Sequence, residues 1–520
     1  MSSHAMILHS FPHTLHFITN LRKTFKRAQR LDLFFRDFLP YFFFIRAQPL
    51  GSRGKISECK SMPNVYIKTY GCQMNERDSE AVAAQLTAKG YTMVPSEHQA
   101  DVVLLNTCSV RDQAEQKAMG KMRNLAVTLK RDRPNVVLGY MGCMAQNRGQ
   151  ALVDKLPDVD LVIGTQKFHH APEYVDRLLA GKDRRIVDTG AEKGSEATIK
   201  EHLLHSASER SAVSAFVSIM QGCNQYCTFC IVPYTRGKER SRSIEDIVQE
   251  CRQLVGRGVR EITLLGQIVN SYGKREIGVK DGKSAFVQLL DAVHAIEDLQ
   301  RIRFTSPHPK GYGDDLIEAY QRLPKLCPSA HIPVQSGSNR ILKRMHRVYT
   351  RERFLEIIGK LRAVNPNMGI TTDIIVGFPG ETEEDFQETF SLAEEVAFDN
   401  AFVFKYSQRT GTPASEMDGQ VPKEIIQRRH AELLQRISAL GHEKYHRLVG
   451  QEVEILVEGP SRRNPARLEG RTGCNKIVVF EGSSDRFKGQ ILRLRVDRVG
   501  SFTLYGDPAI LNLSETIALT

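Results

Sequence analysis

The stretch GCNQYCTFC at residues 222–230 places Cys223, Cys227 and Cys230 in a CxxxCxxC spacing, soon after the apolar run Ala215–Ile219. Such a run is typical of a buried strand, so the three thiols, here called the loop trio, are expected on a loop at a strand end. Three cysteines can bind three irons of a cubane iron–sulfur cluster, whereas a structural zinc site usually has four protein ligands. The fourth iron then stays open to a small molecule. A zinc knuckle or a chance cluster of cysteines is the alternative interpretation.

The composition is typical of a globular chain, with 520 residues, 25% of them charged, and ten cysteines. This length allows roughly two to four domains. The cysteines are too sparse for a disulfide-stapled secreted protein, and their placement in motifs favours metal binding in a reducing, cytoplasmic location. A formal net charge of +12 favours a polyanionic partner. No stretch approaches the roughly 20 apolar residues that span a bilayer, so no membrane association is expected.

Residues 1–61 differ in composition from the rest of the chain. They hold nine of the 24 phenylalanines, and their ten Lys and Arg against three Asp and Glu give a charge of +7. The segment is either a targeting sequence or a wrongly assigned start, in which case translation begins at Met62. The acidic Asp32 and Asp37 fit a transit peptide poorly, so we favour Met62 as the start and leave residues 1–61 out of the fold prediction.

Residues 62–189 repeat one pattern three times. The apolar runs Val65–Tyr70, Asp101–Thr107 and Val136–Gly142 are each followed by a cysteine, and helical patterns at about 77–89 and 111–131 lie between them. The runs predict buried parallel strands, whose carboxyl ends meet at the edge of the sheet where open α/β folds bind ligands. Three thiols at these ends can therefore meet and hold a second cluster. The alternative is that each is an ordinary small buried residue. We call them the N-terminal trio: Cys72, Cys108 and Cys143.

Residues 190–211 are polar and predict a linker, after which strands and helices alternate again through residues 212–445. Six βα units fit a partial or full parallel barrel, in which chemistry occurs at the carboxyl ends of the strands. The loop trio follows the first of these strands. The predicted strands are Ala215–Ile219, Glu261–Leu265, Ile302–Thr305, His331–Val334, Gly369–Val376 and Asn400–Tyr406, and the helices lie at about 243–256, 285–296, 314–321, 338–345, 351–363 and 383–396.

A basic amphipathic helix over about 422–448 leads to residues 446–508, which alternate short apolar runs with turns and predict a small all-β barrel of OB-like size. Its loop-rich part carries arginines suited to phosphate contacts, although such a charge run is more often plain solvated surface. These arginines are Arg462, Arg463, Arg467 and Arg471. Residues 509–520 are predicted to be a C-terminal tail.

Taken in order, these parts resemble the radical S-adenosylmethionine methylthiotransferases and, among them, the tRNA 2-methylthio-isopentenyladenosine synthases (the MiaB family). The resemblance covers about residues 62–508, and the β module is similar to the TRAM domain, an RNA-binding fold. Departures from the family pattern are Ile268, His346, Val348 and the segment 473–475. The most specific segments are YGCQMN at 70–75, NTCSVR at 106–111, residues 222–237, HIPVQSGS at 331–338 and TDIIVGFPGE at 372–381.

The resemblance implies a division of labour between two 4Fe–4S clusters. The loop trio would hold the cluster that cleaves S-adenosylmethionine, giving a radical that takes hydrogen from carbon 2 of isopentenyladenosine beside the tRNA anticodon (position 37). The N-terminal trio would hold the cluster that presents the inserted sulfur, and a second S-adenosylmethionine would supply the methyl group. The resemblance implies as partners the tRNA anticodon loop, a flavodoxin- or ferredoxin-like electron donor and a sulfur donor, with the chain a monomer.

Contacts to S-adenosylmethionine are expected from strand ends, although a glycine there can simply make a turn. No catalytic residue beyond the cluster ligands is predicted. Arg236 and Arg240 follow the loop trio and can reach a carboxylate or phosphate, or form a surface pair, and Glu381 can be a helix N-terminal charge. The predicted cofactor contacts are Gly266, Gln267, Gln335, Ser336 and Gly377.

Three other functions stay open at this stage. A sister enzyme acts on threonylcarbamoyladenosine in tRNA, and another methylthiolates an aspartate of a ribosomal protein. The segments Gln73–Asn75 and Gln267–Tyr272 favour the isopentenyladenosine enzyme, again by resemblance. A structural-metal RNA-binding protein is the non-enzymatic alternative. The remaining cysteines lack partner spacing; Cys251 is predicted in the core of a helix, and Cys59, Cys327 and Cys474 are interpreted as incidental.

Overall fold

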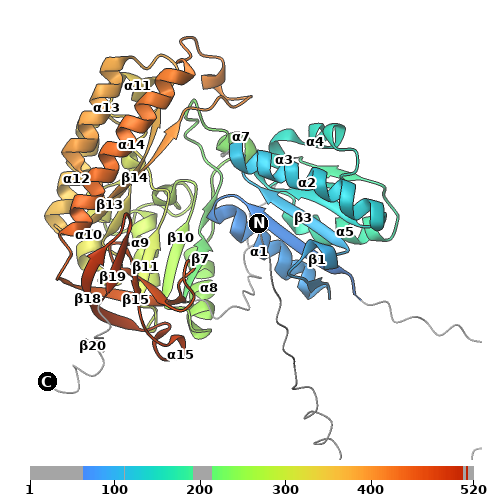
Figure 1. Cartoon of the computed structure of the whole chain (residues 1–520), viewed down its shortest axis with the longest axis horizontal. Helices are drawn as coiled ribbons and strands as arrows, with labels where there is room; N and C mark the ends of the chain where they lie inside the picture. Colours follow the sequence, from blue (N-terminus) through green and yellow to red (C-terminus); the bar gives the residue numbers. More distant parts are fainter. Residues whose placement is uncertain (1–61, 110–111, 191–212, 507–510, 513–520) are drawn as a thin grey trace, which may run out of the picture. The chain divides into compact units, whose positions relative to one another are not determined.

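The computed structural model describes residues 62–109, 112–190, 213–506 and 511–512. The extension 1–61, nearly all of the predicted linker and most of the predicted tail lie outside the described residues. Three regions follow one another along the described part: an α/β domain, a parallel half-barrel and a small β barrel (Figure 1).

The N-terminal domain is built on a parallel sheet with the strand order β2-β1-β3-β4-β5-β6. Its central strands are buried along their whole length, which explains their continuous apolar sequence. Helices α1 and α5 contribute to the core on one face of the sheet, and α2, α3 and α4 to the core on the other. The elements are β1 Asn64–Tyr70, α1 Gln73–Ala88, β2 Thr92–Met93, η1 Glu97–Gln99, β3 Val102–Thr107, α2 Asp112–Asp132, β4 Val137–Met141, α3 Cys143–Arg148, α4 Gln150–Lys155, β5 Leu161–Ile163, η2 Phe168–His170, α5 Ala171–Leu179 and β6 Ile186–Asp188.

The central region contains six parallel strands in two sheets, ordered β11-β10-β7 and β12-β13-β14. An isolated parallel bridge between Ile302 and Leu326 joins the two sheets, and one large apolar core runs behind both. The strands are β7 Ser214–Ser218, β10 Glu261–Leu265, β11 Arg301–Phe304, β12 Ser329–His331, β13 Gly369–Val376 and β14 Asn400–Lys405; the helices are α7 Val232–Arg236, α8 Ile244–Gly256, α9 Ala285–His294, α10 Asp314–Arg322, α11 Asn339–Arg344, α12 Arg351–Val364 and α13 Glu383–Val396; short elements are β8 Met220–Gln221, β9 Arg240–Ser241, η3 Val269–Ser271, η4 Pro309–Gly311 and η5 Pro413–Ser415.

One predicted strand of the half-barrel is wrong in position. The sequence indicates His331–Val334, but β12 ends at His331. Pro333 has no N–H to give to a ladder, and Gln335 has a φ of 71°, so the chain leaves the extended conformation there.

Helix α14, Lys423–His446, packs on β14 and leads into the small β barrel. Strands β15, β16, β17, β19 and β18 pair in that order, and β18 pairs back to β15, so the barrel is closed. This confirms the predicted small all-β fold. Strand β16, with the sequence LEGRT, lacks the run of apolar residues that marks the other strands. The elements are β15 Glu452–Pro460, β16 Leu468–Thr472, β17 Ile477–Phe480, α15 Ser484–Phe487, β18 Ile491–Val499, β19 Thr503–Gly506 and β20 Leu511–Asn512.

The β barrel docks against the amino ends of the half-barrel strands. Arg303 on β11 donates from Nη1 to the Gly473 carbonyl at 2.9 Å and from Nη2 to the Thr472 carbonyl at 2.8 Å. Lys476 pairs with Asp399, just before β14, at 2.7 Å. The turn 473–475, one of the departures from the family pattern, therefore lies in this contact.

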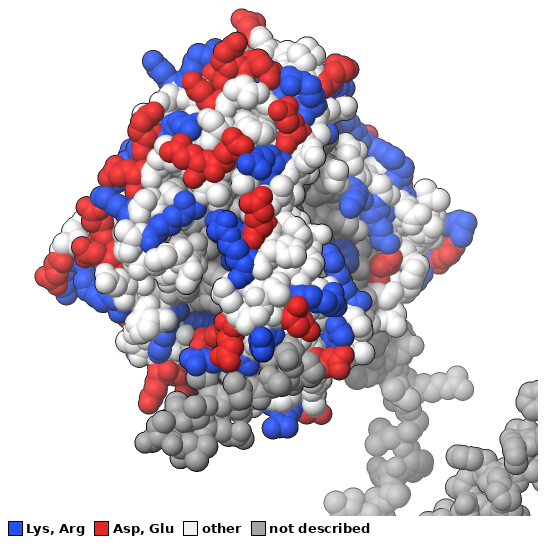
Figure 2. All heavy atoms as spheres, turned by 60° about the vertical axis from the view of Figure 1, so that its left-hand side comes forward, with Lys and Arg blue, Asp and Glu red and all other residues white. Residues whose placement is uncertain are grey.

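On the face in Figure 2, basic and acidic groups are interspersed. No helix within the described ranges is both long enough and apolar enough to cross a membrane.

Candidate active site

The N-terminal trio lies at three neighbouring strand ends. Cys72 follows β1, Cys108 follows β3, and Cys143 opens α3 after β4. In the ladder between β3 and β4, Asn106 is opposite Met141, so Cys108 and Cys143 each stand two residues beyond paired positions. Because adjacent strands are about 4.8 Å apart, this register brings the cysteines to one edge of the sheet.

Small residues and buried amides hold these strand ends together. Gly142 has a φ of 94°, and a Cβ there would come within 2.2 Å of Asn106 Oδ1. The Asn75 side chain donates to Asn106 Oδ1 at 2.9 Å, and the Asn106 amide donates to the Asn75 carbonyl at 2.8 Å. The asparagines therefore tie the start of α1 to the end of β3, beside Cys72.

The thiols of the N-terminal trio interact with one another. A hydrogen bond from Cys108 lowers the pKa of Cys72 to about 5, and the nearby Arg236 guanidinium acts in the same direction. Burial raises the pKa of Cys143, while the positive charge of the nearby Arg236 opposes that shift. The site therefore brings three thiols and one buried cation together, and thiolates are the usual ligands of iron–sulfur clusters.

The loop trio lies between β8 and α7. Gly222 has a φ of 82°, and a Cβ there would lie 2.0 Å from the Lys238 carbonyl oxygen, so only glycine fits at the start of the loop. The Cys230 amide donates to the Cys227 carbonyl at 2.9 Å, which closes the turn. The neighbouring non-glycine residue Tyr226 has a φ of 49°, a conformation that non-glycine residues adopt rarely.

Burial disfavours the thiolate forms of Cys223 and Cys230. It raises the pKa of Cys223 to about 12 and that of Cys230 to about 11, and the charges of neighbouring cysteines add to both shifts. Arg347 supplies positive charge: its Nη1 lies 3.4 Å from Cys227 Sγ, and its Nη2 donates to the Pro333 carbonyl at 3.1 Å. A bound metal centre would offset the remaining cost of three neighbouring thiolates.

The donors in both trios are thiols alone, and thiolate ligands suit iron–sulfur clusters. Among the described residues, no three His, Cys, Asp or Glu side chains lie close enough to ligate one ion. In a cubane, each thiolate binds a different iron, so its ligands stand farther apart than those of one zinc ion.

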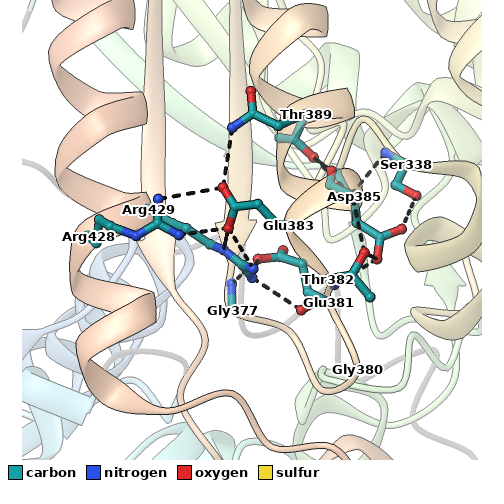
Figure 3. A network of polar contacts seen from close by, with 12 residues as sticks. Ser338, Gly377, Gly380, Glu381, Thr382, Glu383, Asp385, Thr389, Arg428 and Arg429 are labelled. Carbon is teal, nitrogen blue, oxygen red and sulfur yellow. Dashed lines mark hydrogen bonds and ion pairs between the residues drawn. The ribbon is translucent and has the colours of Figure 1, made fainter.

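The predicted cofactor contacts lie at carboxyl ends of half-barrel strands, although several are already engaged within the protein. The Gly377 amide donates to Glu381 Oε1 at 2.9 Å, and Glu381 in turn pairs with Arg429 at 2.7 Å (Figure 3). The Ser336 hydroxyl is buried 3.2 Å from Thr389 Oγ1. Gly266 follows β10, and Gln335 follows β12. Both backbone groups of Gln335, its N–H and its carbonyl, form hydrogen bonds with β13.

Three buried polar atoms at the same end of the half-barrel have no hydrogen-bond partner among the described residues: Gln267 Oε1, His308 Nε2 and Tyr406 OH. They follow β10, β11 and β14. His308 accepts a bond from the Lys310 amide at Nδ1, and burial lowers its pKa to about 2, so its ring is neutral and Nε2 is a donor. A polar ligand at this end would satisfy such groups. Sequence reasoning predicted Gln267 but missed His308 and Tyr406, whose only signal was polar character after a strand.

Helix α7 connects the two trios. It begins two residues after Cys230 and ends at Arg236, whose Nη2 donates to Asp78 Oδ2 on α1 at 2.7 Å. Arg236 was predicted to reach a carboxylate or phosphate, and it does reach a carboxylate, in the interior rather than as a surface pair. From beyond β14, Arg409 also donates to the carbonyl of Ser109, beside Cys108, at 2.8 Å.

Comparison with known proteins gives three matched families: the radical SAM superfamily over residues 217–393, an uncharacterized family, UPF0004, over 64–164, and the TRAM domain over 446–509. A tRNA-2-methylthio-N(6)-dimethylallyladenosine synthase of Opitutus terrae is 53% identical over 470 residues, covering 86% of this chain and 97% of the relative. The synthase of the same name from Akkermansia muciniphila is 51% identical, covering 86% and 99%. A radical S-adenosylmethionine methyltransferase, TsrM, from Kitasatospora setae shares the fold with a TM-score of 0.53 at 12% identity, over 68% of this chain and 75% of that one.

Fold and site together define a radical S-adenosylmethionine enzyme that carries a second cysteine-bearing domain and a TRAM domain. Such enzymes use S-adenosylmethionine and a 4Fe–4S cluster. The chain belongs to the family of tRNA-2-methylthio-N(6)-dimethylallyladenosine synthases, which confirms the resemblance drawn from its motifs.

Proposed function

We propose that this chain adds a methylthio group to carbon 2 of isopentenyladenosine beside the tRNA anticodon. The observation that carries the proposal is the pairing of two cysteine trios in separate domains, joined by the five-residue helix α7. One trio alone would suit a radical enzyme, but sulfur insertion needs a second sulfur-bearing centre. The close similarity to synthases named for this reaction favours it over the threonylcarbamoyladenosine and ribosomal-protein alternatives.

In this proposal the loop trio of Cys223, Cys227 and Cys230 holds the cluster that accompanies S-adenosylmethionine. When bound, the two supply a carbon radical able to open an unactivated carbon–hydrogen bond, which acid–base groups cannot do. The protein's part is to bind and orient. Gln267, His308 and Tyr406 offer buried polar atoms to the cofactor, and Arg347 bonds the sulfur of Cys227. Contacts from Gly266, Gln335, Ser336 and Gly377 stay predictions.

The N-terminal trio of Cys72, Cys108 and Cys143 holds the second 4Fe–4S cluster in this proposal. Its ionised Cys72 and the adjoining Arg236 favour a ligand set with net negative charge. The proposal includes a flavodoxin- or ferredoxin-like electron donor and a reducing, cytoplasmic setting, because low-potential clusters need electrons and lose them to oxygen. It also includes a sulfur donor and a monomeric state.

The TRAM barrel would hold the tRNA backbone while the anticodon loop enters the site, since RNA is usually recognised at single-stranded loops whose bases can splay out. The four predicted arginines differ in availability. Arg467 pairs with Glu481 at 2.9 Å and Arg471 with Glu458 at 2.8 Å, whereas Arg462 and Arg463 are exposed. The latter two are the better candidates for phosphate contacts.

Nucleoside analysis of tRNA from cells lacking the gene tests the proposal. We expect loss of the methylthio group and accumulation of isopentenyladenosine, with restoration by the intact gene. Loss of the methylthio group from threonylcarbamoyladenosine would point to the first sister enzyme. Unchanged tRNA nucleosides would rule out a tRNA substrate, and the ribosomal protein would then be analysed by mass spectrometry.

Single cysteine variants test the division of labour. We expect Cys72→Ala to keep cleavage of S-adenosylmethionine but abolish sulfur insertion, and Cys227→Ala to abolish both. Cys251→Ala is the matched control, because this thiol is buried in α8 outside both trios, and it should retain both activities. The reconstituted protein should hold about eight irons, four for each cubane. Zinc without cofactor cleavage would instead indicate a structural-metal RNA-binding protein.

A further inference from the structure

We propose that Arg236 is a positioning residue of the N-terminal site: its buried guanidinium, which pairs with Asp78 and lies near the cysteine sulfurs, sets the reduction potential of the cluster that binds there. The inference rests on the proposed second cluster. It assigns the control of that cluster to a residue of the other domain, supplied by the helix that follows the loop trio.

The guanidinium pairs with a buried anion and lies near the thiols. Arg236 is 4% exposed, and its partner Asp78 is 3% exposed at an Nη2–Oδ2 distance of 2.7 Å. The positive charge of the same guanidinium acts on the side chains of Cys143 and Cys72. A guanidinium has five N–H donors in a fixed plane, so one arginine can serve a carboxylate and a sulfur together.

The surrounding contacts hold this arginine in place. The hydroxyl of Thr165, after β5, donates to the carbonyl of Thr235, the residue before Arg236. Gly237 follows with a φ of 75°, and a Cβ there would come within 2.8 Å of Gln166 Nε2. The end of α7 is thus packed against the N-terminal domain on both sides of Arg236, and the guanidinium has little freedom to leave the thiols.

A cation beside a cluster favours the reduced state. Reduction adds one negative charge, and both net charge and hydrogen bonds to the sulfurs tune the reduction potential of an iron–sulfur cluster. Arg236 stabilises that added charge, and Asp78 opposes it. Removal of the cation should therefore lower the potential, and neutralisation of the carboxylate should raise it.

The opposite shifts in reduction potential distinguish an electrostatic role of Arg236 from a purely structural one. Arg236→Gln and Asp78→Asn both break the same ion pair, so both would weaken the contact between the domains in the same way. Only an electrostatic action on the cluster moves the potential in opposite directions for the two substitutions.

The test uses the full chain with Cys223, Cys227 and Cys230 changed to alanine, so that only the N-terminal cluster is present, and an EPR-monitored redox titration. We expect Arg236→Gln to lower the reduced-to-oxidised ratio at a fixed potential at least tenfold, about 59 mV for one electron. Asp78→Asn should shift the midpoint upward. Arg236→Lys keeps the charge, so its midpoint potential should stay nearer than that of Arg236→Gln to the value of the parent, the chain that carries only the three alanine substitutions.

Glu250→Gln is the matched control. Glu250 is buried and pairs with Arg77 on α1 at 2.7 Å, so it joins the same two domains without contacting the trio. Its potential should equal that of the parent. Shifts of one sign for Arg236→Gln and Asp78→Asn, or an equal shift for Glu250→Gln, would overturn the inference while leaving the proposed function intact. Absence of any cluster in the parent would overturn the second cluster itself.

Discussion

Local contacts shift the pKa values of Cys72 and Cys223 in opposite directions. Cys72 accepts a hydrogen bond from Cys108 and lies near Arg236, so its pKa falls to about 5. Cys223 lies in a loop where burial dominates, and its pKa rises to about 12. At neutral pH the first is a thiolate and the second a thiol, and only the thiolate is an effective nucleophile.

Alkylation of the chelator-treated, reduced protein should reveal this difference. We expect iodoacetamide to label Cys72 before Cys223 at pH 7, with a Cys72 rate that stays nearly constant from pH 6 to 9 because its thiolate is already formed. Peptide mass spectrometry at each pH gives the two rates. In guanidinium chloride both should rise with pH like ordinary thiols of pKa about 8.5. A Cys72 rate that climbs tenfold per pH unit in the folded protein would contradict the lowered pKa.

Sequence could indicate the thiols but not the charges around them. The spacing of the loop trio and the strand-end positions of Cys72, Cys108 and Cys143 are local or periodic signals. The contact between Arg236 and Asp78 joins residues 158 positions apart, and Arg409 reaches Ser109 across 300. Such pairs depend on how the domains pack, which no spacing encodes. The assignment of all six cysteines as cluster ligands stays a prediction.

Elements with strong patterns were predictable, and those set by tertiary contacts were not. The ranges Glu261–Leu265 and Gly369–Val376 match β10 and β13 at both ends, because buried parallel strands have long apolar runs. Strand β12 is only three residues long and is flanked by a proline segment, so its position depended on pairing with β13.

One buried arginine of helix α14 forms an ion pair with the loop that follows β13. Arg429, whose side chain is 4% exposed, pairs with Glu381, 2% exposed, which also accepts the Gly377 amide (Figure 3). Burial raises the pKa of Glu381, and Arg429 opposes that shift. The carboxylate predicted from sequence as a helix charge is therefore an internal link between the loop and α14.

We expect Arg429→Ala to lower the free energy of unfolding by about 3–5 kcal/mol, because it leaves Glu381 buried without its partner. The adjacent Arg428→Ala is the control: that side chain is 52% exposed and pairs with Glu383, so its loss should cost about 1 kcal/mol or less. Urea unfolding followed by tyrosine fluorescence measures both, since the chain has no tryptophan. Equal losses for the two variants would show that the buried pair has no special role.

At the scale of the whole molecule, the TRAM barrel is fixed to the half-barrel by charged contacts. Arg303 joins Glu261 at 2.9 Å and the turn at residues 472–473, and Lys476 joins Asp399. These contacts lie at the amino ends of the strands, whereas the loop trio follows the carboxyl end of β7. The turn at residues 472–476 is therefore covered by the half-barrel, and RNA would bind elsewhere on the TRAM barrel. The predicted domain boundaries at 62–189, 212–445 and 446–508 stay predictions, since the region around the first junction lies outside the described residues.

An RNA held by the TRAM barrel should bind with a salt dependence set by its phosphate contacts. Each lysine or arginine that neutralises a phosphate releases counterions and adds about 0.7 to the slope of log affinity against log salt for a single strand. We expect the double variant Arg462→Gln/Arg463→Gln to reduce that slope by about 1.4, measured by fluorescence anisotropy with an anticodon stem–loop between 50 and 200 mM salt. Arg467→Gln/Arg471→Gln removes the same charge from arginines already paired with Glu481 and Glu458, so its slope should change less. If both double variants reduce the slope equally, overall charge rather than placed contacts would govern binding, and the exposed pair would lose its assigned role.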